Sequence, residues 1–225
     1  MLSRLVDLMV PPRCRLCAAE CRSGAQLCAR CESGLSRIEP RAWPIPGLDL
    51  VWSAARYEGV ARRLVIVLKF GPRPALARRA AAAIAERAPA ELLSGVIVPV
   101  PAAPWRRRRR GFDPAESIAM ALAAQTGIEL RRCLRRSQGR RQVGRPRAER
   151  LADPPRVKVA GRAPHRALLV DDVVTTGATL GACAEALRAA GTGRVDGVSF
   201  ARSGLPWPSR RTTKKGLRND PTGVP

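Results

Sequence analysis

Short apolar runs alternate along the chain with longer segments in which apolar residues recur every three or four positions. The short runs have the aliphatic composition of buried parallel strands, and the longer segments have the periodicity of amphipathic helices. The predicted strands are residues 51–57, 95–100, 168–170 and 194–200. The predicted helices are residues 59–68, 74–88, 114–125 and 178–190. This alternation predicts an α/β fold, in which helices cover a mostly parallel sheet.

Polar and Pro-rich segments divide the chain into three predicted parts. Residues 1–45 hold a short helix, with its apolar residues on one face, and a small cysteine module. A Pro-rich linker at 39–47 leads to the α/β domain, residues 46–201. Residues 202–225 are expected to be a disordered basic tail. Within the domain, residues 131–162 are rich in arginine and poor in apolar residues, so we expect them to be partly ordered at best without a ligand.

No stretch of the sequence reads as a membrane span or a secretory signal. Residues 1–9 are too short and too polar for either, and no other segment approaches the length of a span. We therefore expect a cytoplasmic protein, in which cysteines stay reduced.

Five of the seven cysteines lie close together near the start of the chain. Cys14-x-x-Cys17 and Cys28-x-x-Cys31 are separated by ten residues, a spacing that can bring four thiolates onto one tetrahedral ion. We expect structural zinc on these four residues, with Cys21 as a spare that can replace one of them. Disulfides, or reduced cysteines on a small loop, are the alternatives.

A strand, a pair of carboxylates and a turn rich in hydroxyl groups follow one another at residues 168–180. Asp171 and Asp172 come where the apolar run ends, and Thr175-Thr176-Gly177-Ala178-Thr179 precedes the last long helix. Backbone amides of such a turn at a helix N-terminus bind a phosphate, and carboxylates accept hydrogen bonds from sugar hydroxyls. The pattern predicts a sugar 5-phosphate site, whereas the simpler interpretation is a strand that turns into a helix through a Thr/Gly cap.

Basic residues exceed acidic ones by a wide margin, which gives the chain a formal net charge of +23. Such an excess favours polyanions: nucleic acid, nucleotides or an anionic membrane surface. The densest run, Arg106 through Arg110, is expected to form a loop between a strand and a helix. This loop is either an anion site for a diphosphate or nucleic-acid backbone, or a solvated basic loop. The run comprises Arg106, Arg107, Arg108, Arg109 and Arg110.

The Asp-Asp and Thr-Thr-Gly stretch closely resembles the phosphoribosyl-pyrophosphate (PRPP) signature of type I phosphoribosyltransferases. Together with the paired CxxC motifs, Lys69-Phe70-Gly71 and the run Val-Pro-Val-Pro…Arg-Gly-Phe at 98–112, it resembles the ComF family, phosphoribosyltransferase-like proteins linked to DNA uptake in natural competence. The resemblance covers about residues 1–201. Asp113-Pro114 stands where the family more often has Asn-Gln.

This resemblance implies a type I phosphoribosyltransferase fold and assigns roles to individual residues. Asp171 and Asp172 would hold the ribose hydroxyls, and Mg²⁺ would accompany the diphosphate of PRPP. Lys69 and the arginine run would be anion contacts, and residues 131–162 would be a hood that closes over PRPP, with Gln142 and Arg150 at family positions. The remaining PRPP contacts would be Val173, Val174, Thr175, Thr176, Gly177, Ala178 and Thr179.

Three functions are compatible with these motifs. The first is a ComF-like factor that binds PRPP or a related sugar phosphate and contacts single-stranded DNA, with a DNA-uptake helicase as a possible partner. The second is an active phosphoribosyltransferase of nucleotide metabolism, for which no acceptor-binding segment is identifiable. The third is a non-catalytic nucleic-acid-binding module. Aromatic residues that could stack on bases are few, among them Trp43, Trp52, Trp105 and Phe112, so DNA binding is expected to be mainly electrostatic.

Overall fold

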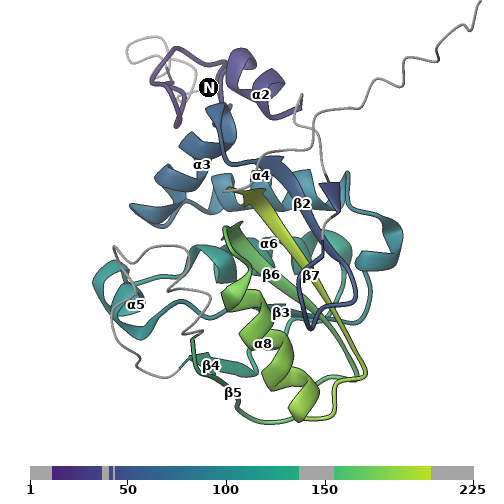
Figure 1. The fold of residues 1–225 in the computed structure, drawn as a ribbon. Helices are drawn as coiled ribbons and strands as arrows, with labels where there is room; N and C mark the ends of the chain where they lie inside the picture. The colour runs from purple at the N-terminus through teal and green to yellow at the C-terminus, as the bar shows by residue number, and fades with distance from the viewer. Residues whose placement is uncertain (1–11, 37–40, 43, 137–154, 204–225) are drawn as a thin grey trace, which may run out of the picture.

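The computed structural model describes residues 12–36, 41–42, 44–136 and 155–203. Its centre is a five-stranded sheet in the order β1-β2-β7-β6-β3 (Figure 1). Strands β2, β7, β6 and β3 are parallel, and only the short edge strand β1 is antiparallel. The strands of this sheet are β1 (Arg41–Ala42), β2 (Val51–Arg56), β3 (Val96–Pro99), β6 (Arg166–Val174) and β7 (Arg194–Arg202). The predicted mostly parallel α/β fold is confirmed.

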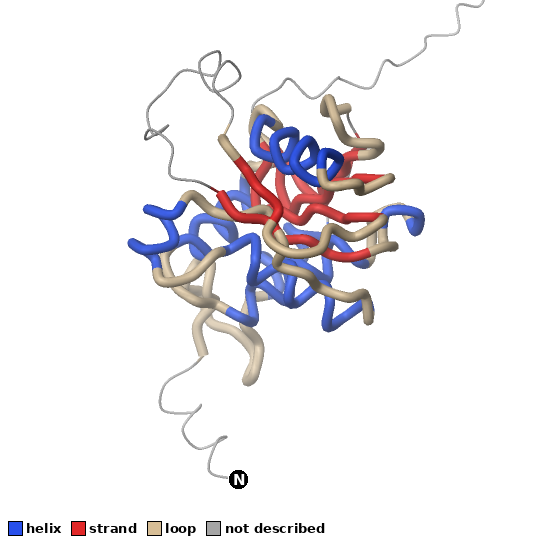
Figure 2. The backbone as a smooth tube through the Cα atoms, turned by 90° about the horizontal axis from the view of Figure 1, so that it is seen from below, coloured by secondary structure: helices blue, strands red, loops and turns tan. Residues whose placement is uncertain are grey.

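Helices cover both faces of the sheet, as the view along its edge shows (Figure 2). One face carries α3 (Gly59–Lys69), α4 (Pro74–Ala85) and α6 (Pro114–Thr126), whereas α8 (Ala178–Ala189) lies on the other. The shorter elements are α2 (Ala29–Ser36), the 3-10 turn η1 (Ala90–Leu92) and α5 (Pro104–Arg110). The alternation of apolar residues along β6 explains the two layers, because Leu168 packs with the first group of helices and Leu169 with α8.

The arginine run does not form the predicted loop, since Arg106–Arg110 belong to helix α5. Pro104 occupies its first turn, where the missing amide hydrogen is not needed. Gly111 ends it in the left-handed conformation, with φ of 75°, and its amide donates to the Arg107 carbonyl. Arginine has a high helix propensity, and these two end signals suffice for a two-turn helix despite the repulsion between like charges.

Strand β6 is longer than predicted. The apolar run at 168–170 was expected to end before Asp171, but the strand continues through both aspartates to Val174. Pairing with β7 accounts for the extension, because Asp171 is in register with Ser199 and Val174 with Arg202. The two carboxylates are therefore held on a regular strand rather than on a loop.

The Pro-rich segment predicted as a linker packs onto the domain where the structure describes it. Arg41 and Ala42 pair with β2, and Ile45 is buried against Gly177. The cysteine module is also joined to the domain, because Cys31 and Leu35 belong to the same buried cluster as the α3 residue Leu64. The division into three domains remains a prediction.

A two-stranded antiparallel ribbon lies beside the main sheet. It pairs β4 (Leu134–Arg136) with β5 (Val157–Val159), and the central part of the predicted hood, 137–154, lies outside the described residues. The predicted N-terminal helix and residues 204–225 of the tail lie outside them as well. No helix in the described part of the chain has the length and apolar character needed to cross a membrane.

Candidate functional site

The candidate site lies at the edge where the parallel strands β2, β3, β6 and β7 end. Ligands of open α/β sheets bind at this edge, in the loops that lead from strands into helices. Strand β6 brings Asp171 and Asp172 there, and the turn Thr175–Thr179 connects it to α8. The structure therefore brings the predicted carboxylates and the predicted phosphate turn together at one edge.

Asp172 is paired with the last residue of α3. The Lys69 Nζ atom lies 3.2 Å from Asp172 Oδ2, and both side chains are largely enclosed, with exposed fractions of 29% and 15%. Asp172 Oδ2 is itself buried and receives no hydrogen bond from the described residues. Lys69 is thus placed to neutralise this carboxylate, while the oxygen keeps capacity to accept a hydrogen bond from a ligand.

Asp171 accepts a hydrogen bond from its neighbour, since the Asp172 amide donates to Asp171 Oδ1 at 2.8 Å. Loss of solvation around the carboxyl, reinforced by the adjacent Asp172 charge, raises the pKa of Asp171 well above its usual value. A carboxyl in such surroundings gains from partners that donate hydrogen bonds or carry positive charge. Sugar hydroxyls and a divalent cation are both partners of this kind.

Asp113, the residue at which the sequence departs from the ComF pattern, has a structural role. Its Oδ2 accepts from the Ala102 amide at 2.8 Å, and its Oδ1 accepts from the Ala115 amide at 3.0 Å. It is the N-cap of α6 and is 7% exposed. Burial raises the pKa of Asp113, although the two amides oppose the shift. Its two oxygens clamp the loop after β3 to the start of α6.

The turn from β6 to α8 is tight and leaves several backbone amides without an acceptor among the described residues. Gly177 adopts the left-handed conformation, with φ of 82°, and a Cβ atom there would lie 2.7 Å from Ile45 Cδ1. Thr176 Oγ1 accepts from the Ala178 amide at 3.3 Å. Within the described residues, the amides of Thr176, Gly177 and Thr179 have no acceptor. These open donors lie at the N-terminus of α8, where the helix dipole favours an anion.

A pocket of about 160 Å³ lies between α5, the start of α6 and the β4–β5 ribbon, and neither Asp171 nor Asp172 is among the residues that line it. Pro99 and Asp113 line it, together with four arginines. Glu116 holds two of the arginines, with Arg107 at 3.7 Å and Arg132 in a closer ion pair. The arginines that line the pocket are Arg107, Arg132, Arg135 and Arg136.

The predicted anion residues are distributed over several surroundings. Of the arginine run, Arg107 lines this pocket, whereas the Arg106 guanidinium lies 5.3 Å from the centre of the Trp105 ring. Arg108 and Arg109 are exposed, and Arg110 is half-buried. Gln142 and Arg150 lie outside the described residues. The sequence did not single out Arg132, Arg135 and Arg136 as residues that line the pocket. The pairing of β4 with β5 that positions them is short, and it leaves only a weak pattern of apolar residues.

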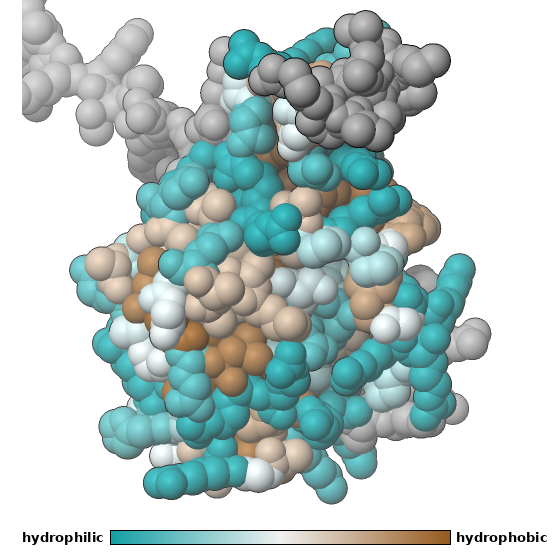
Figure 3. Space-filling view, turned by 180° about the vertical axis from the view of Figure 1, so that it is seen from behind, coloured by the Kyte–Doolittle hydropathy of each residue, from teal (hydrophilic) through white to brown (hydrophobic). Residues whose placement is uncertain are grey.

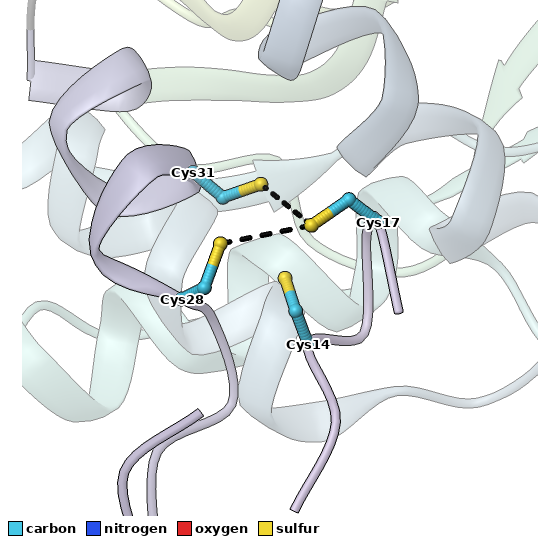
Figure 4. A group of neighbouring side chains, drawn as sticks. All are labelled: Cys14, Cys17, Cys28 and Cys31. Atoms are coloured by element: carbon cyan, nitrogen blue, oxygen red, sulfur yellow. Dashed lines mark hydrogen bonds between the residues drawn. The ribbon is translucent and has the colours of Figure 1, made fainter. Parts of the chain in front are cut away.

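The four predicted zinc ligands converge at the N-terminal module (Figure 4). Their sulfur atoms all lie within 4.8 Å of one another, and Cys17 Sγ is 3.6 Å from both Cys28 Sγ and Cys31 Sγ. Four thiolates around a tetrahedral zinc at 2.3 Å are about 3.8 Å apart, so the cluster fits a metal such as zinc. Cys21 is not one of the four.

Two of these thiols differ in acidity. Burial opposes ionisation of Cys14, but hydrogen bonds from the backbone of Cys28, Leu16 and Cys17 outweigh it and lower the pKa of Cys14 to about 6. Burial raises the pKa of Cys31 above that of an ordinary thiol. A bound cation would stabilise the thiolate form of both.

The described part of the chain thus combines a mostly parallel α/β sheet with an N-terminal module that brings four cysteines together. The chain is 33% identical over 107 residues to Competence protein ComFC of Streptococcus pneumoniae, a match that covers 47% of each chain. The match thus spans about half the length of this curated relative, and its name agrees with the resemblance to the ComF family that the motifs indicated.

The two other comparisons add less. No protein-family model matches the chain. Among solved structures, a purine phosphoribosyltransferase from Pyrococcus horikoshii is similar, with 21% identity and a TM-score of 0.34. This similarity covers 56% of the present chain and 82% of that one.

Proposed function

We propose that this chain is a ComF-like protein that binds PRPP or a related sugar phosphate at the edge formed by Asp171, Asp172 and the turn 175–179. The observation that carries the proposal is the arrangement of these groups. Two carboxylates lie directly before open amides at the N-terminus of α8, with Lys69 beside Asp172. The carboxylates repel a phosphate but accept hydrogen bonds from hydroxyl groups, whereas the amides donate hydrogen bonds to the phosphate oxygens. A sugar 5-phosphate satisfies both groups.

Mg²⁺ would enter this site with the diphosphate of PRPP. The ion takes oxygen ligands and is usually shared between one or two carboxylates and substrate phosphates. Asp171 and Asp172 fit this role, because Asp172 Oδ2 receives no hydrogen bond from the described residues and the Asp171 carboxyl is poorly solvated. The arginine-lined pocket at the end of the neighbouring strand β3 supports a second anionic group, such as the diphosphate.

Calorimetric titration with PRPP and Mg²⁺ tests the proposal, with ribose 5-phosphate and buffer salts as controls. We expect saturable PRPP binding that is lost in the double variant Asp171→Asn/Asp172→Asn, while affinity for single-stranded DNA stays almost unchanged. A double variant that binds PRPP as well as the parent would overturn the assignment of the site.

The second part of the proposal is contact with single-stranded DNA during DNA uptake in the cytoplasm. The net charge of +23 and the exposed arginines of α5 support an electrostatic contact, and the competence name of the S. pneumoniae relative supports the context. A DNA-uptake helicase is then the expected protein partner. Replacing Arg106–Arg110 should weaken binding to single-stranded DNA and flatten its dependence on salt, and an unchanged salt slope would contradict this role.

An active phosphoribosyltransferase is the alternative function, and the arginine-lined pocket supports it. The hood and the pocket would exclude water from an oxocarbenium-like transition state, and the carboxylates would orient the ribose. Release of diphosphate from PRPP in the presence of candidate bases or amines distinguishes the two functions. Turnover that depends on Asp171 would establish the enzyme.

A further inference from the structure

Phe70 projects from the C-terminal end of α3 into solvent. Its side chain is 85% exposed, and Met120 at 51% is the other large apolar residue classed as exposed in the described part of the chain. The Phe70 amide donates to the Val67 carbonyl at 3.2 Å, which fixes the backbone beneath the ring. Single exposed apolar residues are common on protein surfaces, so the surroundings of the ring must decide whether it has a role.

Along the chain, the nearest charged residues on either side of the ring are basic, although Lys69, which precedes it, pairs with the carboxylate of Asp172. Residues 59–79 contain six arginines and lysines and no aspartate or glutamate. Arg62, Arg63 and Arg73 are exposed, and none of them forms an ion pair with an acidic residue among those the structure describes. With a rise of 1.5 Å per residue, Arg62 and Arg63 lie about 10–12 Å before Phe70 along the axis of α3. An apolar ring is thus flanked by cations on both sides.

Phe70 also adjoins the candidate sugar-phosphate site. It follows Lys69, whose Nζ is 3.2 Å from Asp172 Oδ2, so the ring and the carboxylate pair lie at the same end of the sheet. α6, which carries Met120, covers one face of the sheet instead (Figures 1 and 2). The view from behind shows apolar residues interspersed with hydrophilic ones on that side of the molecule (Figure 3).

The tryptophans named as stacking candidates have different environments. Trp52 is 3% exposed and belongs to the core, so it cannot stack on a ligand. Trp105 is half-buried, and the Arg106 guanidinium already lies over its ring at 5.3 Å. Trp43 lies outside the described residues. Phe112 is half-buried as well, so among the described residues Phe70 offers the open aromatic face that the expectation of mainly electrostatic binding did not include.

We propose that Phe70 is a stacking platform for an unpaired base of single-stranded nucleic acid, whose phosphates are bound by Arg62, Arg63 and Arg73. A base in a duplex is already stacked on its neighbours, whereas an unpaired base gains from an aromatic face. Cations beside the ring supply the sequence-independent attraction to the backbone. This inference deepens the DNA-contact part of the proposed function and names a surface separate from α5.

Binding of a fluorescein-labelled oligothymidylate, measured by anisotropy at several salt concentrations, tests the inference. Phe70→Ala should weaken binding by roughly tenfold without changing the salt slope, because stacking releases no counterions. Phe70→Tyr should keep the parent affinity, and Met120→Ala, which removes the other exposed apolar side chain, should leave it unchanged. The triple variant Arg62→Gln/Arg63→Gln/Arg73→Gln should lower the slope by about two.

An affinity of Phe70→Ala within twofold of the parent would overturn the inference, and so would a parent protein that does not bind the oligonucleotide. PRPP titration of the same variants distinguishes failure of the stacking proposal from failure of the sugar-phosphate proposal. Phe70→Ala should bind PRPP as the parent does. If the parent fails to bind PRPP while the loss of DNA affinity at Phe70 persists, the sugar-phosphate proposal fails and the stacking platform stands.

Discussion

Lys69 Nζ lies 3.2 Å from Asp172 Oδ2, which joins the end of α3 to the strand that carries both aspartates of the candidate site. The contact unites two segments that the sequence suggested separately, the Lys69-Phe70-Gly71 motif and the Asp-Asp pair. It places a positive charge beside one carboxylate only. Asp171, one residue earlier, instead accepts a hydrogen bond from the Asp172 amide. The two aspartates therefore differ in charge environment, and their variants should behave differently.

Replacement of Lys69 should lower the stability of the protein, because it leaves the carboxylate of Asp172 without its positively charged partner. Lys69→Met removes the neutralising charge from a largely enclosed carboxylate, so we expect a loss of about 1–2 kcal/mol in the free energy of unfolding. Lys158→Met is the matched control, since Lys158 is exposed on β5 and forms no ion pair with a described residue. That variant should change stability by less than about 0.5 kcal/mol. Urea unfolding of both variants measures the difference, and equal losses would contradict a specific Lys69–Asp172 interaction.

Asp171→Asn should stabilise the ligand-free protein at neutral pH while abolishing PRPP binding. The folded protein raises the pKa of Asp171 well above its usual value, so between these two values the native state binds more protons than the unfolded state. Stability therefore falls as pH rises through this window, and it falls because a poorly solvated carboxyl must ionise. Asparagine removes this loss and can still accept the hydrogen bond from the Asp172 amide.

Thermal unfolding between pH 3 and pH 8 checks the sign of this effect. The gain in Tm from Asp171→Asn should be present at pH 7 and should vanish near pH 3, where Asp171 is protonated in both states. Asp172→Asn is the contrasting variant, because it loses the ion pair with Lys69 and should lower Tm at pH 7. A decrease in Tm at pH 7 for both variants would show that the negative charge of Asp171 does not lower the stability of the ligand-free protein.

The sequence predicted the main strands and helices because their apolar periodicity is strong. It also predicted that the two CxxC pairs converge and that the Asp-Asp pair precedes a turn, because the spacing of these motifs is specific. The prediction failed where contacts between residues distant in sequence determine the structure. Pairing with β7 extends β6 beyond Asp171, and contact with Gly177 buries Ile45 in a segment whose prolines suggested a linker. The helix α5 was missed for a different reason. Pro104 and Gly111 marked its ends, but the five intervening arginines were interpreted as a loop, either an anion site or a solvated basic loop.

Gly177→Ala should disrupt the phosphate turn more than an equivalent change elsewhere. Gly177 has φ of 82°, and an added Cβ would meet Ile45 Cδ1 at 2.7 Å. Gly161 is the matched control, because it has φ of 87° but no atom within 4 Å of an added Cβ. Both variants pay the conformational penalty of about 1 kcal/mol, and Gly177→Ala adds overpacking of about 1–3 kcal/mol.

Chemical unfolding compares the two glycine variants, and PRPP titration reports on the turn. Gly161→Ala should retain binding, whereas Gly177→Ala should lose it because the amides at the start of α8 are displaced. Adding Ile45→Ala should relieve the overpacking in Gly177→Ala and recover part of the stability. Equal destabilisation by Gly177→Ala and Gly161→Ala would show that Ile45 yields without cost and that the close approach has no energetic consequence.

The cysteine cluster should hold one zinc per chain and stabilise the whole protein. Cys31 and Leu35 share a buried cluster with Leu64 of α3, so disorder of the module would expose part of the core of the domain. Cys14→Ser and Cys28→Ser should each abolish the bound zinc and lower Tm, as should a strong chelator added to the parent protein. Cys21→Ser should retain both, because Cys21 is not among the four converging thiols. Elemental analysis of protein purified without chelator measures the metal, and protein that is folded and free of zinc would refute a structural metal site.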